Sequence, residues 1–392
     1  MSKAVIKVLA AEGMRILTVP LRLLPVKRNR ILFTGLTGGK SYDYSCNPKY
    51  IYEYLKEHEP QRYEYVWAVA DPGRFSFLED EGVMLVKHYS LRSFKDLLTS
   101  RVIVTNGSYA PWFAFRKSQY VINTWHGGGA YKNVENETPN ADWATRRRAR
   151  FCADNIDLFL ASCRVQKEQM IRTTYQYRGQ VLEAGTPRND MLVNGNTVAA
   201  AEKVRRYYEI PAGARIVLYA PTYRNLQTKV CLDADALLAA LEKNGEKWYL
   251  ISRYHRYQES SSNVSVVGDR VLNGADYPDM QELLCAADAM VTDYSSCIWD
   301  YGFLERPCAL FVPDKEEYIS SNGFYVGPDD WPFPQTRSVD QLAEALGELL
   351  SAGESFEAYR KRVRKHLAEL GSYETGRAAE AVAGKIKEYT NA

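Results

Sequence analysis

The chain has 392 residues, 46% of them hydrophobic, which is enough apolar material for two sizeable domain cores. Its 50 basic and 48 acidic residues nearly cancel, which argues against a protein that coats nucleic acid through a general positive charge. The seven cysteines are scattered without a Cys-x-x-Cys pair, so they indicate reduced thiols rather than a disulfide framework or a zinc site.

The first 29 residues mix basic and apolar side chains around a single acid, Glu12. They contain no uncharged run near the roughly 20 residues that span a bilayer, and no cleavable secretory signal. The pattern favours an amphipathic helix, broken at Pro20, in the interface of an anionic membrane leaflet. The alternative is a helix packed on the protein's own surface. We expect residues 1–29 to attach the protein peripherally, as a monotopic protein, to the cytoplasmic face of the membrane.

From Arg30 onward, short β-rich runs alternate with helix-like stretches, which is typical of an α/β fold with parallel sheets. The twelve runs are Ile31–Thr34, Tyr65–Val69, Val83–Val86, Val102–Thr105, Tyr120–Trp125, Asp157–Ala161, Val181–Ala184, Ile216–Ala220, Trp248–Ser252, Val264–Val267, Ala289–Thr292 and Pro307–Val312.

A turn-rich, charged stretch near residues 194–208 separates the seven earlier runs from the five later ones. We therefore predict two doubly wound, Rossmann-like domains, residues 30–198 and residues 199–392 with C-terminal helices, facing each other across a cleft. Ligands of such sheets bind at the carboxyl ends of the strands, so residues that follow each run are the first candidates for function.

The first candidate is Asn123-Thr-Trp-His-Gly-Gly-Gly, in which a strand ends in a histidine followed by three glycines. Glycines allow the main-chain N–H groups to face an anion while His126 projects from the strand end. A near-neutral pKa suits a base that removes a proton from an alcohol. A tight turn with a satisfied structural histidine is the alternative.

The second candidate is Ser252-Arg-Tyr-His-Arg-Tyr, which places His255 between Arg253 and Arg256 after a strand. Two guanidinium groups beside an imidazole form a phosphate pocket, and His255 could hydrogen-bond a phosphoryl oxygen or protonate a leaving phosphate. A solvated basic turn is the alternative. Arg224 follows the first strand of the second domain and is a further candidate phosphate contact.

The third candidate is Thr292-Asp-Tyr-Ser-Ser, where a strand gives way to a helix that begins near Ser295 and Ser296. Backbone N–H groups and two hydroxyls there suit a pyrophosphate without a metal. Asp293 could orient the loop, and Asp300 could reach a ribose or a basic partner. A plain serine N-cap is the alternative.

Three further features are ambiguous. The cluster Arg146, Arg147 and Arg148 could hold an anionic lipid head group or polymer, or simply be a solvated helix face. Arg188 and Asp190 are interpreted as a structural ion pair. Asp233-Ala-Asp is better read as a helix cap than as a metal site, so we predict neither a catalytic metal nor a cofactor.

In order and spacing, these motifs resemble the CDP-glycerol glycerophosphotransferase family of wall teichoic acid biosynthesis. The resemblance begins at Asn47-Pro-Lys-Tyr, continues through Thr124-Trp-His-Gly, Gly185-Thr-Pro-Arg-Asn-Asp and Tyr219-Ala-Pro-Thr-Tyr-Arg, and ends at Glu316-Glu-Tyr and Gly323-Phe-Tyr. It implies a GT-B-like domain pair with the acceptor on the first domain and CDP-glycerol on the second.

The resemblance also implies residue roles. His126 falls on the family's general base, His255 on its second histidine near the donor phosphates, and Ser295 and Ser296 on the pyrophosphate site. We place Gly127, Gly128 and Lys132, with the cluster Arg146, Arg147 and Arg148, on the acceptor or lipid side.

The expected reaction transfers glycerol phosphate to a hydroxyl of a lipid-linked glycan and releases CMP. By its length the chain is closer to the priming enzymes, whose acceptor is an undecaprenyl-pyrophosphate-linked disaccharide. The alternatives are a CDP-ribitol enzyme, a chain-extending poly(glycerol phosphate) transferase, or a non-catalytic membrane module that binds anionic polymer.

Overall fold

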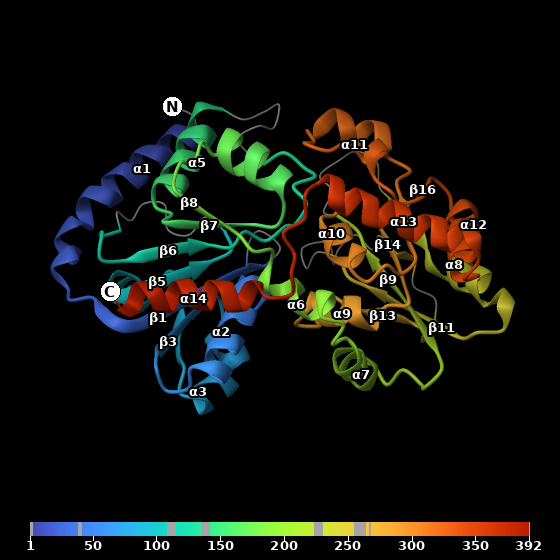
Figure 1. Cartoon of the computed structure of the whole chain (residues 1–392), viewed down its shortest axis with the longest axis horizontal. Coiled ribbons are helices and arrows are strands. Elements are labelled where there is room, and N and C mark those ends of the chain that lie inside the picture. Colours follow the sequence, from blue (N-terminus) through green and yellow to red (C-terminus); the bar gives the residue numbers. More distant parts are fainter. Residues whose placement is uncertain are drawn as a thin grey trace. The chain divides into compact units, whose positions relative to one another are not determined.

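A computed structural model describes residues 3–37, 41–107, 115–134, 142–222, 230–254, 264–265 and 268–391. The chain divides into two compact units, whose elements are labelled in Figure 1. Unit 1 comprises residues 1–126, 134–190 and 373–392, and unit 2 comprises residues 127–133 and 191–372. Each unit is built on its own parallel sheet and is described separately.

Unit 1 contains an eight-stranded sheet with the order β4-β3-β1-β5-β6-β7-β8, to which β2 adds an antiparallel edge pairing with β1. The switch in strand order lies between β1 and β5, where open α/β sheets bind ligands. The strands are β1 Lys27–Thr37, β2 Ser41–Asp43, β3 Glu64–Val69, β4 Met84–Lys87, β5 Ser100–Thr105, β6 Tyr120–Asn123, β7 Leu158–Ala161 and β8 Gln180–Glu183.

Helices cover both faces of this sheet, because successive residues of a strand point to opposite sides. Ile31 and Phe33 join the core beneath α2 and α14, while Leu32 joins the core beneath α4. The helical segments are α1 Lys3–Leu17, η1 Val19–Leu23, α2 Cys46–His58, η2 Pro72–Phe75, α3 Phe77–Asp80, α4 Leu91–Thr99, α5 Trp143–Asp154, η4 Gln166–Thr174, η5 Pro187–Asn189 and α14 Ala378–Asn391.

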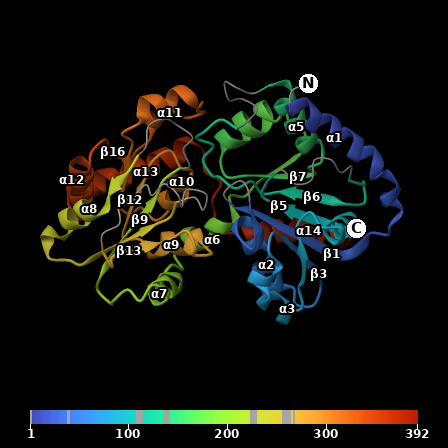
Figure 2. The same cartoon turned by 180° about the vertical axis from the view of Figure 1, so that it is seen from behind.

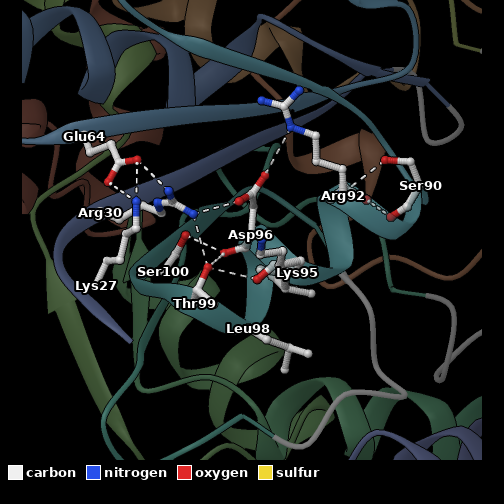
Figure 3. Close-up of polar contacts among 12 residues, drawn as sticks. Lys27, Arg30, Glu64, Ser90, Arg92, Lys95, Asp96, Leu98, Thr99 and Ser100 are labelled. Carbon is white, nitrogen blue, oxygen red and sulfur yellow. Dashed lines mark hydrogen bonds and ion pairs between the residues drawn. The ribbon is translucent and has the colours of Figure 1, made fainter. Parts of the chain in front are cut away.

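A buried polar cluster fastens β1 to β3 and α4 (Figure 3). Arg30 donates to Asp96 at 2.7 Å and to Glu64 at 2.5 Å, although only 5% of Arg30 is exposed. These hydrogen bonds from Arg30 hold the pKa of the Glu64 carboxyl below its usual value. Removal of one partner from the buried Arg30–Asp96 pair would leave an uncompensated charge and weaken the contact between β1 and α4.

Unit 2 contains a six-stranded parallel sheet with the order β13-β11-β9-β14-β15-β16, and a separate pair formed by β10 and β12. Its switch in strand order lies between β9 and β14. The strands are β9 Arg215–Ala220, β10 Leu232–Asp233, β11 Trp248–Ser252, β12 Val264–Ser265, β13 Val271–Asn273, β14 Ala289–Thr292, β15 Cys308–Phe311 and β16 Gln335–Thr336.

One face of the unit 2 sheet packs against α8 and α12 around Val217, Leu250 and Val291. The helical segments that lie in this unit or enter it are α6 Asp190–Val193, α7 Val198–Tyr207, α8 Ala234–Leu241, η6 Glu242–Asn244, α9 Met280–Ala286, α10 Cys297–Gly302, α11 Lys315–Ser321, η8 Pro328–Asp330, α12 Val339–Leu350 and α13 Glu354–Glu369.

The N-terminal helix α1 lies along α5, and both views of the fold show the two helices side by side (Figures 1 and 2). Val8 is buried there with Ala144 and Phe151. Arg147 pairs with Glu12 at 3.1 Å, so part of α1 does pack on the protein's own surface. Among the residues that the structure describes, no helix combines the length and apolar character needed to cross a membrane.

Each of the twelve β-rich runs overlaps a strand, whereas β2, β10, β13 and β16 were not expected. The domain boundaries also differ from the expected ones. Helix α14 belongs to unit 1 because Val382 and Ile386 are buried in the unit 1 core. Residues 127–133 belong to unit 2, and the main division falls between Asp190 and Met191 rather than at residue 198.

Candidate functional site

His126 follows β6 at the carboxyl end of the unit 1 sheet, as the sequence predicts, and its side chain is exposed. Its ring stacks on the Trp125 indole with centroids 4.5 Å apart. Trp125 has a φ of +54°, a left-handed conformation that is uncommon for a bulky side chain. The histidine is therefore presented by a strained turn, and such strain is concentrated at functional sites.

The imidazole Nδ1 of His126 lies 2.9 Å from the carbonyl oxygen of Asn106, which follows β5. Asn106 is fully buried, and its side-chain amide forms hydrogen bonds with both the N–H and the carbonyl of Leu36, near the end of β1. These contacts place His126 at the β1/β5 switch in strand order. The only sequence signal for Asn106 is its position directly after the predicted strand Val102–Thr105.

Two buried residues hold the backbone of the histidine turn. Asn47 Nδ2 donates to the carbonyls of Thr124 at 3.2 Å and Trp125 at 2.9 Å. Arg188 Nη1 donates to the His126 carbonyl at 2.6 Å, and the Arg188 amide donates to Asn47 Oδ1 at 3.1 Å. Asn47 had entered only as the start of the family resemblance, because nothing in a lone Asn-Pro-Lys-Tyr indicates a contact 77 residues away.

The expected ion pair between Arg188 and Asp190 is wrong, because the two side chains have different partners. The Asp190 carboxylate accepts from the amides of Ala378 and Ala379, both at 2.8 Å, and so caps the first turn of α14. Burial raises the pKa of Asp190. The amide and hydroxyl of Thr186 in the same loop donate to Glu374. The loop therefore contacts the start of the C-terminal segment, residues 373–392, which belongs to unit 1.

The glycine segment after His126 is packed within unit 2. A Cβ added to Gly128 would lie 1.9 Å from Trp299 Cδ1, so glycine is required by close packing. Lys132 Nζ lies 3.4 Å from the Tyr318 hydroxyl. We expected Gly127, Gly128 and Lys132 on the acceptor side of the first domain, but they are part of the unit that carries β14 and α10.

At the β9/β14 switch of unit 2, Asp293 accepts hydrogen bonds from the Thr222 amide and hydroxyl. Asp293 thus connects its own loop after β14, the one that the sequence suggests it orients, to the loop after β9. Ser295 and Ser296 are half-buried and lie immediately before α10, which begins at Cys297. Ser296 makes no side-chain cap bond to the helix. The strand-end positions inferred from the sequence are therefore present in unit 2.

Two predicted donor contacts have internal partners instead. Asp300 is 2% exposed and accepts a hydrogen bond from Gln281 at 3.1 Å, because the first turn of α10 faces the interior. Arg253 donates to the backbone carbonyls of Gly274, Ala275 and Tyr277 and braces the loop after β13. Both residues are fixed within the protein.

Several candidates have other outcomes. Arg224, His255, Arg256 and the side chain of Arg148 lie outside the described residues. Arg146 and Arg147 lie on α5, where Arg147 is engaged with Glu12 and Phe151. Among the described residues, no group of three or more His, Cys, Asp or Glu side chains has the arrangement of a metal site.

Two Rossmann-like sheets, each with candidate site residues at its strand-order switch, define a GT-B-like fold of the α/β class. The chain belongs to the CDP-Glycerol:Poly(glycerophosphate) glycerophosphotransferase family, whose sequence model matches residues 17–388. It is therefore related to the enzymes of teichoic acid biosynthesis.

Three relatives and one solved structure illustrate the relationship. The chain is 28% identical to the teichoic acid poly(glycerol phosphate) polymerase of Bacillus subtilis (strain 168) over 84% of its own length but only 45% of that protein. It is 27% identical to the teichoic acid glycerol-phosphate transferase of Staphylococcus aureus, over 92% of this chain and 93% of that one.

The teichoic acid ribitol-phosphate primase of Bacillus spizizenii is 23% identical over 94% of this chain and 93% of that protein. The fold is similar to that of a variant of the wall teichoic acid polymerase TagF soaked with CDPG. The TM-score is 0.82 at 24% identity, and the match covers 99% of this chain and 97% of that chain.

Proposed function

We propose that the protein transfers glycerol phosphate from CDP-glycerol to a hydroxyl of a membrane lipid-linked glycan and releases CMP. Membership of the family over residues 17–388 supports the reaction class. The observation that carries the mechanism is the contact of His126 Nδ1 with the Asn106 carbonyl. Because a carbonyl only accepts, Nδ1 bears the proton in the neutral imidazole, and Nε2 has the lone pair that a base needs.

In this mechanism Nε2 of His126 takes the proton of the acceptor hydroxyl as its oxygen attacks the phosphorus attached to glycerol. The bond from that phosphorus to the CMP oxygen breaks, CMP leaves with the electron pair, and a phosphodiester forms. His255, Arg224 and Arg256 are proposed to contact the donor phosphates and stabilise the charge that develops on them.

The loop between β14 and α10 is the proposed donor-side element of unit 2. Asp293 fixes it to Thr222, and Ser295 and Ser296 within it are half-buried. A phosphate accepts hydrogen bonds from hydroxyl and backbone N–H groups without a metal. Lys132 belongs to the same unit, so we propose that its positive charge acts on the phosphates of CDP-glycerol rather than on the acceptor.

The exposed apolar side chains of α1 and η1 support attachment to an anionic membrane surface. Ile16 and Leu17 are each 71% exposed, and Leu23 is 89% exposed. Val8 covers α5, so the opposite face remains available to lipid. We place the protein peripherally at the cytoplasmic face, where an undecaprenyl-pyrophosphate-linked disaccharide would be its acceptor.

A second candidate is transfer of ribitol phosphate from CDP-ribitol, favoured by the similarity to the ribitol-phosphate primase over 94% of this chain. A third candidate is the addition of many glycerol phosphate units to one acceptor, which the similarity to poly(glycerol phosphate) polymerases favours. The chain spans 45% of the Bacillus subtilis polymerase.

One experiment separates these candidates. The protein is incubated with the undecaprenyl-pyrophosphate-linked disaccharide and either CDP-glycerol or CDP-ribitol, and the lipid product is analysed by mass spectrometry. We expect one added glycerol phosphate per acceptor and one CMP released for each transfer. Addition of ribitol phosphate, or of a long series of units, would replace the leading proposal. Binding of poly(glycerol phosphate) without transfer from either donor would identify a non-catalytic module.

A further inference from the structure

The backbone of the histidine turn is held in a conformation that its own sequence does not favour. Trp125 has a φ of +54°, and a large side chain in the left-handed region is strained. The Trp125 amide donates to Asn123 Oδ1 at 2.8 Å, which closes one side of the turn. Other contacts must supply the rest of the constraint.

Asn47 supplies it from α2. Its Nδ2 donates to the Trp125 carbonyl at 2.9 Å, and its Oδ1 accepts from the Arg188 amide at 3.1 Å. Asn47 is fully buried, so water does not compete for these bonds. One side chain therefore joins the histidine turn to the loop after β8.

Arg188 completes the connection. Its Nη1 donates to the carbonyl of His126 at 2.6 Å, and the residue is only 8% exposed. A charged donor forms a strong hydrogen bond with a defined direction. The His126 carbonyl and its imidazole are thus fixed from two sides, by Arg188 and by Asn106.

We propose that Asn47 and Arg188 are positioning residues that hold the turn so that Nδ1 of His126 meets the Asn106 carbonyl. Neither side chain needs to contact substrate. Their effect is to keep the proton on Nδ1 and the lone pair on Nε2, as the support of a metal-bound or catalytic histidine commonly does. The inference rests on the proposed role of His126 as base, but its structural part can be measured without any turnover.

The test uses the full-length chain labelled with ¹⁵N at histidine. Long-range proton–nitrogen spectra distinguish an Nδ1-protonated imidazole from an Nε2-protonated one, and the His126→Ala spectrum identifies the His126 signals. Arg188→Ala, Arg188→Lys, Asn47→Ala and Asn47→Asp are compared with the wild type, together with kcat and KM for CDP-glycerol.

We expect the wild type to show the Nδ1-protonated form at neutral pH. In Arg188→Ala and Asn47→Ala the two forms should mix, and kcat should fall about 10- to 100-fold, the usual effect of removing a second-layer contact. The KM for CDP-glycerol should change less than about twofold, because the base does not bind the donor. Arg188→Lys, which keeps a donor, should recover part of kcat and of the Nδ1-protonated form.

Arg178→Ala is the matched control, because exposed Arg178 also donates to a backbone carbonyl, that of Arg172. It should leave the tautomer and kcat unchanged. If an alanine variant loses its folded circular dichroism, Arg188→Lys and Asn47→Asp decide the question. Wild-type tautomer and kcat in the folded variants, or a change confined to donor KM, would overturn the proposal.

The same measurements separate this inference from the proposed function. Full transfer activity in His126→Ala would refute the base, whatever the tautomer spectra show. Inactive His126→Ala with fully active Arg188→Ala and Asn47→Ala would retain the base and refute the positioning role.

Discussion

The carboxylate of Asp293 accepts hydrogen bonds from both the backbone amide and the hydroxyl of Thr222, the latter at 2.6 Å. Asp293 follows β14 and Thr222 follows β9, so the pair closes the strand-order switch of unit 2. Asp293 is 1% exposed. Its partners, rather than solvent, therefore determine the conformation of the loop on the proposed donor side.

The Asp293→Ala variant should release the loop after β9 and leave the Thr222 amide without this acceptor. We expect a loss of about 1–3 kcal/mol in the free energy of unfolding, because a buried donor loses its partner. The KM for CDP-glycerol should rise more than tenfold if the loop binds the donor. Urea unfolding and steady-state kinetics measure the two effects independently.

Thr222→Ser keeps the hydroxyl and should resemble the wild type, whereas Thr222→Val removes it and should show part of the Asp293→Ala phenotype. If these variants lower the free energy of unfolding but leave the KM for CDP-glycerol unchanged, the pair has only a structural role. That result would contradict its assignment to donor binding.

The His126→Gln variant tests the proposed base. Glutamine retains a polar side chain but cannot accept a proton near neutral pH, so kcat should fall about 10²- to 10⁴-fold. Transfer of label from CDP-glycerol to the lipid fraction gives the rate. Because the side chain is exposed, the free energy of unfolding should change little.

His58→Gln is the matched control. His58 is also an exposed histidine whose Nδ1 lies 3.0 Å from a backbone carbonyl, that of Tyr54, and whose ring stacks on an aromatic neighbour. Its rate should equal that of the wild type. Equal rates for the His126 and His58 variants would remove His126 from the mechanism.

The strand positions could be predicted because apolar β-rich runs are local features of sequence. Trp248–Ser252 and Ala289–Thr292 were predicted with the same bounds that the strands have. The short edge strands β13 and β16 are stabilised by pairing with β11 and β15 rather than by a distinctive local pattern, so they were missed.

The support of the site could not be predicted for a related reason. Asn47, Asn106 and Arg188 meet the histidine turn from three separate parts of unit 1. A single sequence records no such distant contacts. The sequence predicts that Asp300 can reach a ribose or a basic partner, whereas in the structure it lies in the first turn of α10 and accepts a hydrogen bond from Gln281. The direction in which a helix turn faces depends on packing that a single sequence does not record.

The Gly128→Ala variant should destabilise unit 2. The new methyl group would lie 1.9 Å from Trp299 Cδ1 and 2.5 Å from Nε1, and Trp299 is fully buried. Overpacking of this kind costs about 1–3 kcal/mol. Thermal unfolding of the single variant, and of the double variant with Trp299→Phe, measures the cost and its relief.

The smaller phenylalanine ring leaves room for the new methyl group. Trp299→Phe should therefore cost less stability in the Gly128→Ala background than in the wild type, as expected for two residues in contact. Gly347→Ala in α12 is the control, because outside the neighbouring backbone of that helix no described atom lies within 4 Å of the added Cβ. Strictly additive effects of the two substitutions would contradict a direct clash.

Buried His88 predicts a pH-dependent stability of unit 1. Burial lowers its pKa from 6.5 to about 4, and its ring stacks on Tyr42 with centroids 3.5 Å apart. Because the folded pKa is the lower one, the unfolded chain binds the proton first as pH falls. The full stability is present above pH 6.5, and about 3 kcal/mol is lost between pH 6.5 and 4.

His88→Phe keeps an aromatic ring against Tyr42 but cannot bind a proton, so its urea midpoint should vary less with pH than that of the wild type. The pKa of His366 is lowered by burial in the same direction, and this contribution remains in both proteins. The difference between the two curves isolates His88, and parallel curves from pH 7 to 4.5 would refute the prediction.

The exposed face of α1 and η1 should determine membrane binding. Ile16→Ser, Leu17→Ser and Leu23→Ser together remove three apolar side chains that are at least 71% exposed. Each such side chain contributes up to about 1.5–3 kcal/mol when buried in lipid. The triple variant should therefore lose at least tenfold in affinity for vesicles that contain an anionic phospholipid, measured by flotation.

Substitution is a sharper test than deletion of the segment, because Val8 is buried against α5 and deletion would uncover Phe151. Val198→Ser, Tyr207→Ser and Ile319→Ser form the control set, since these side chains are exposed in unit 2. They should leave flotation unchanged. A similar loss in both triple variants would indicate nonspecific hydrophobic adsorption, and no loss in the first would refute attachment through this segment.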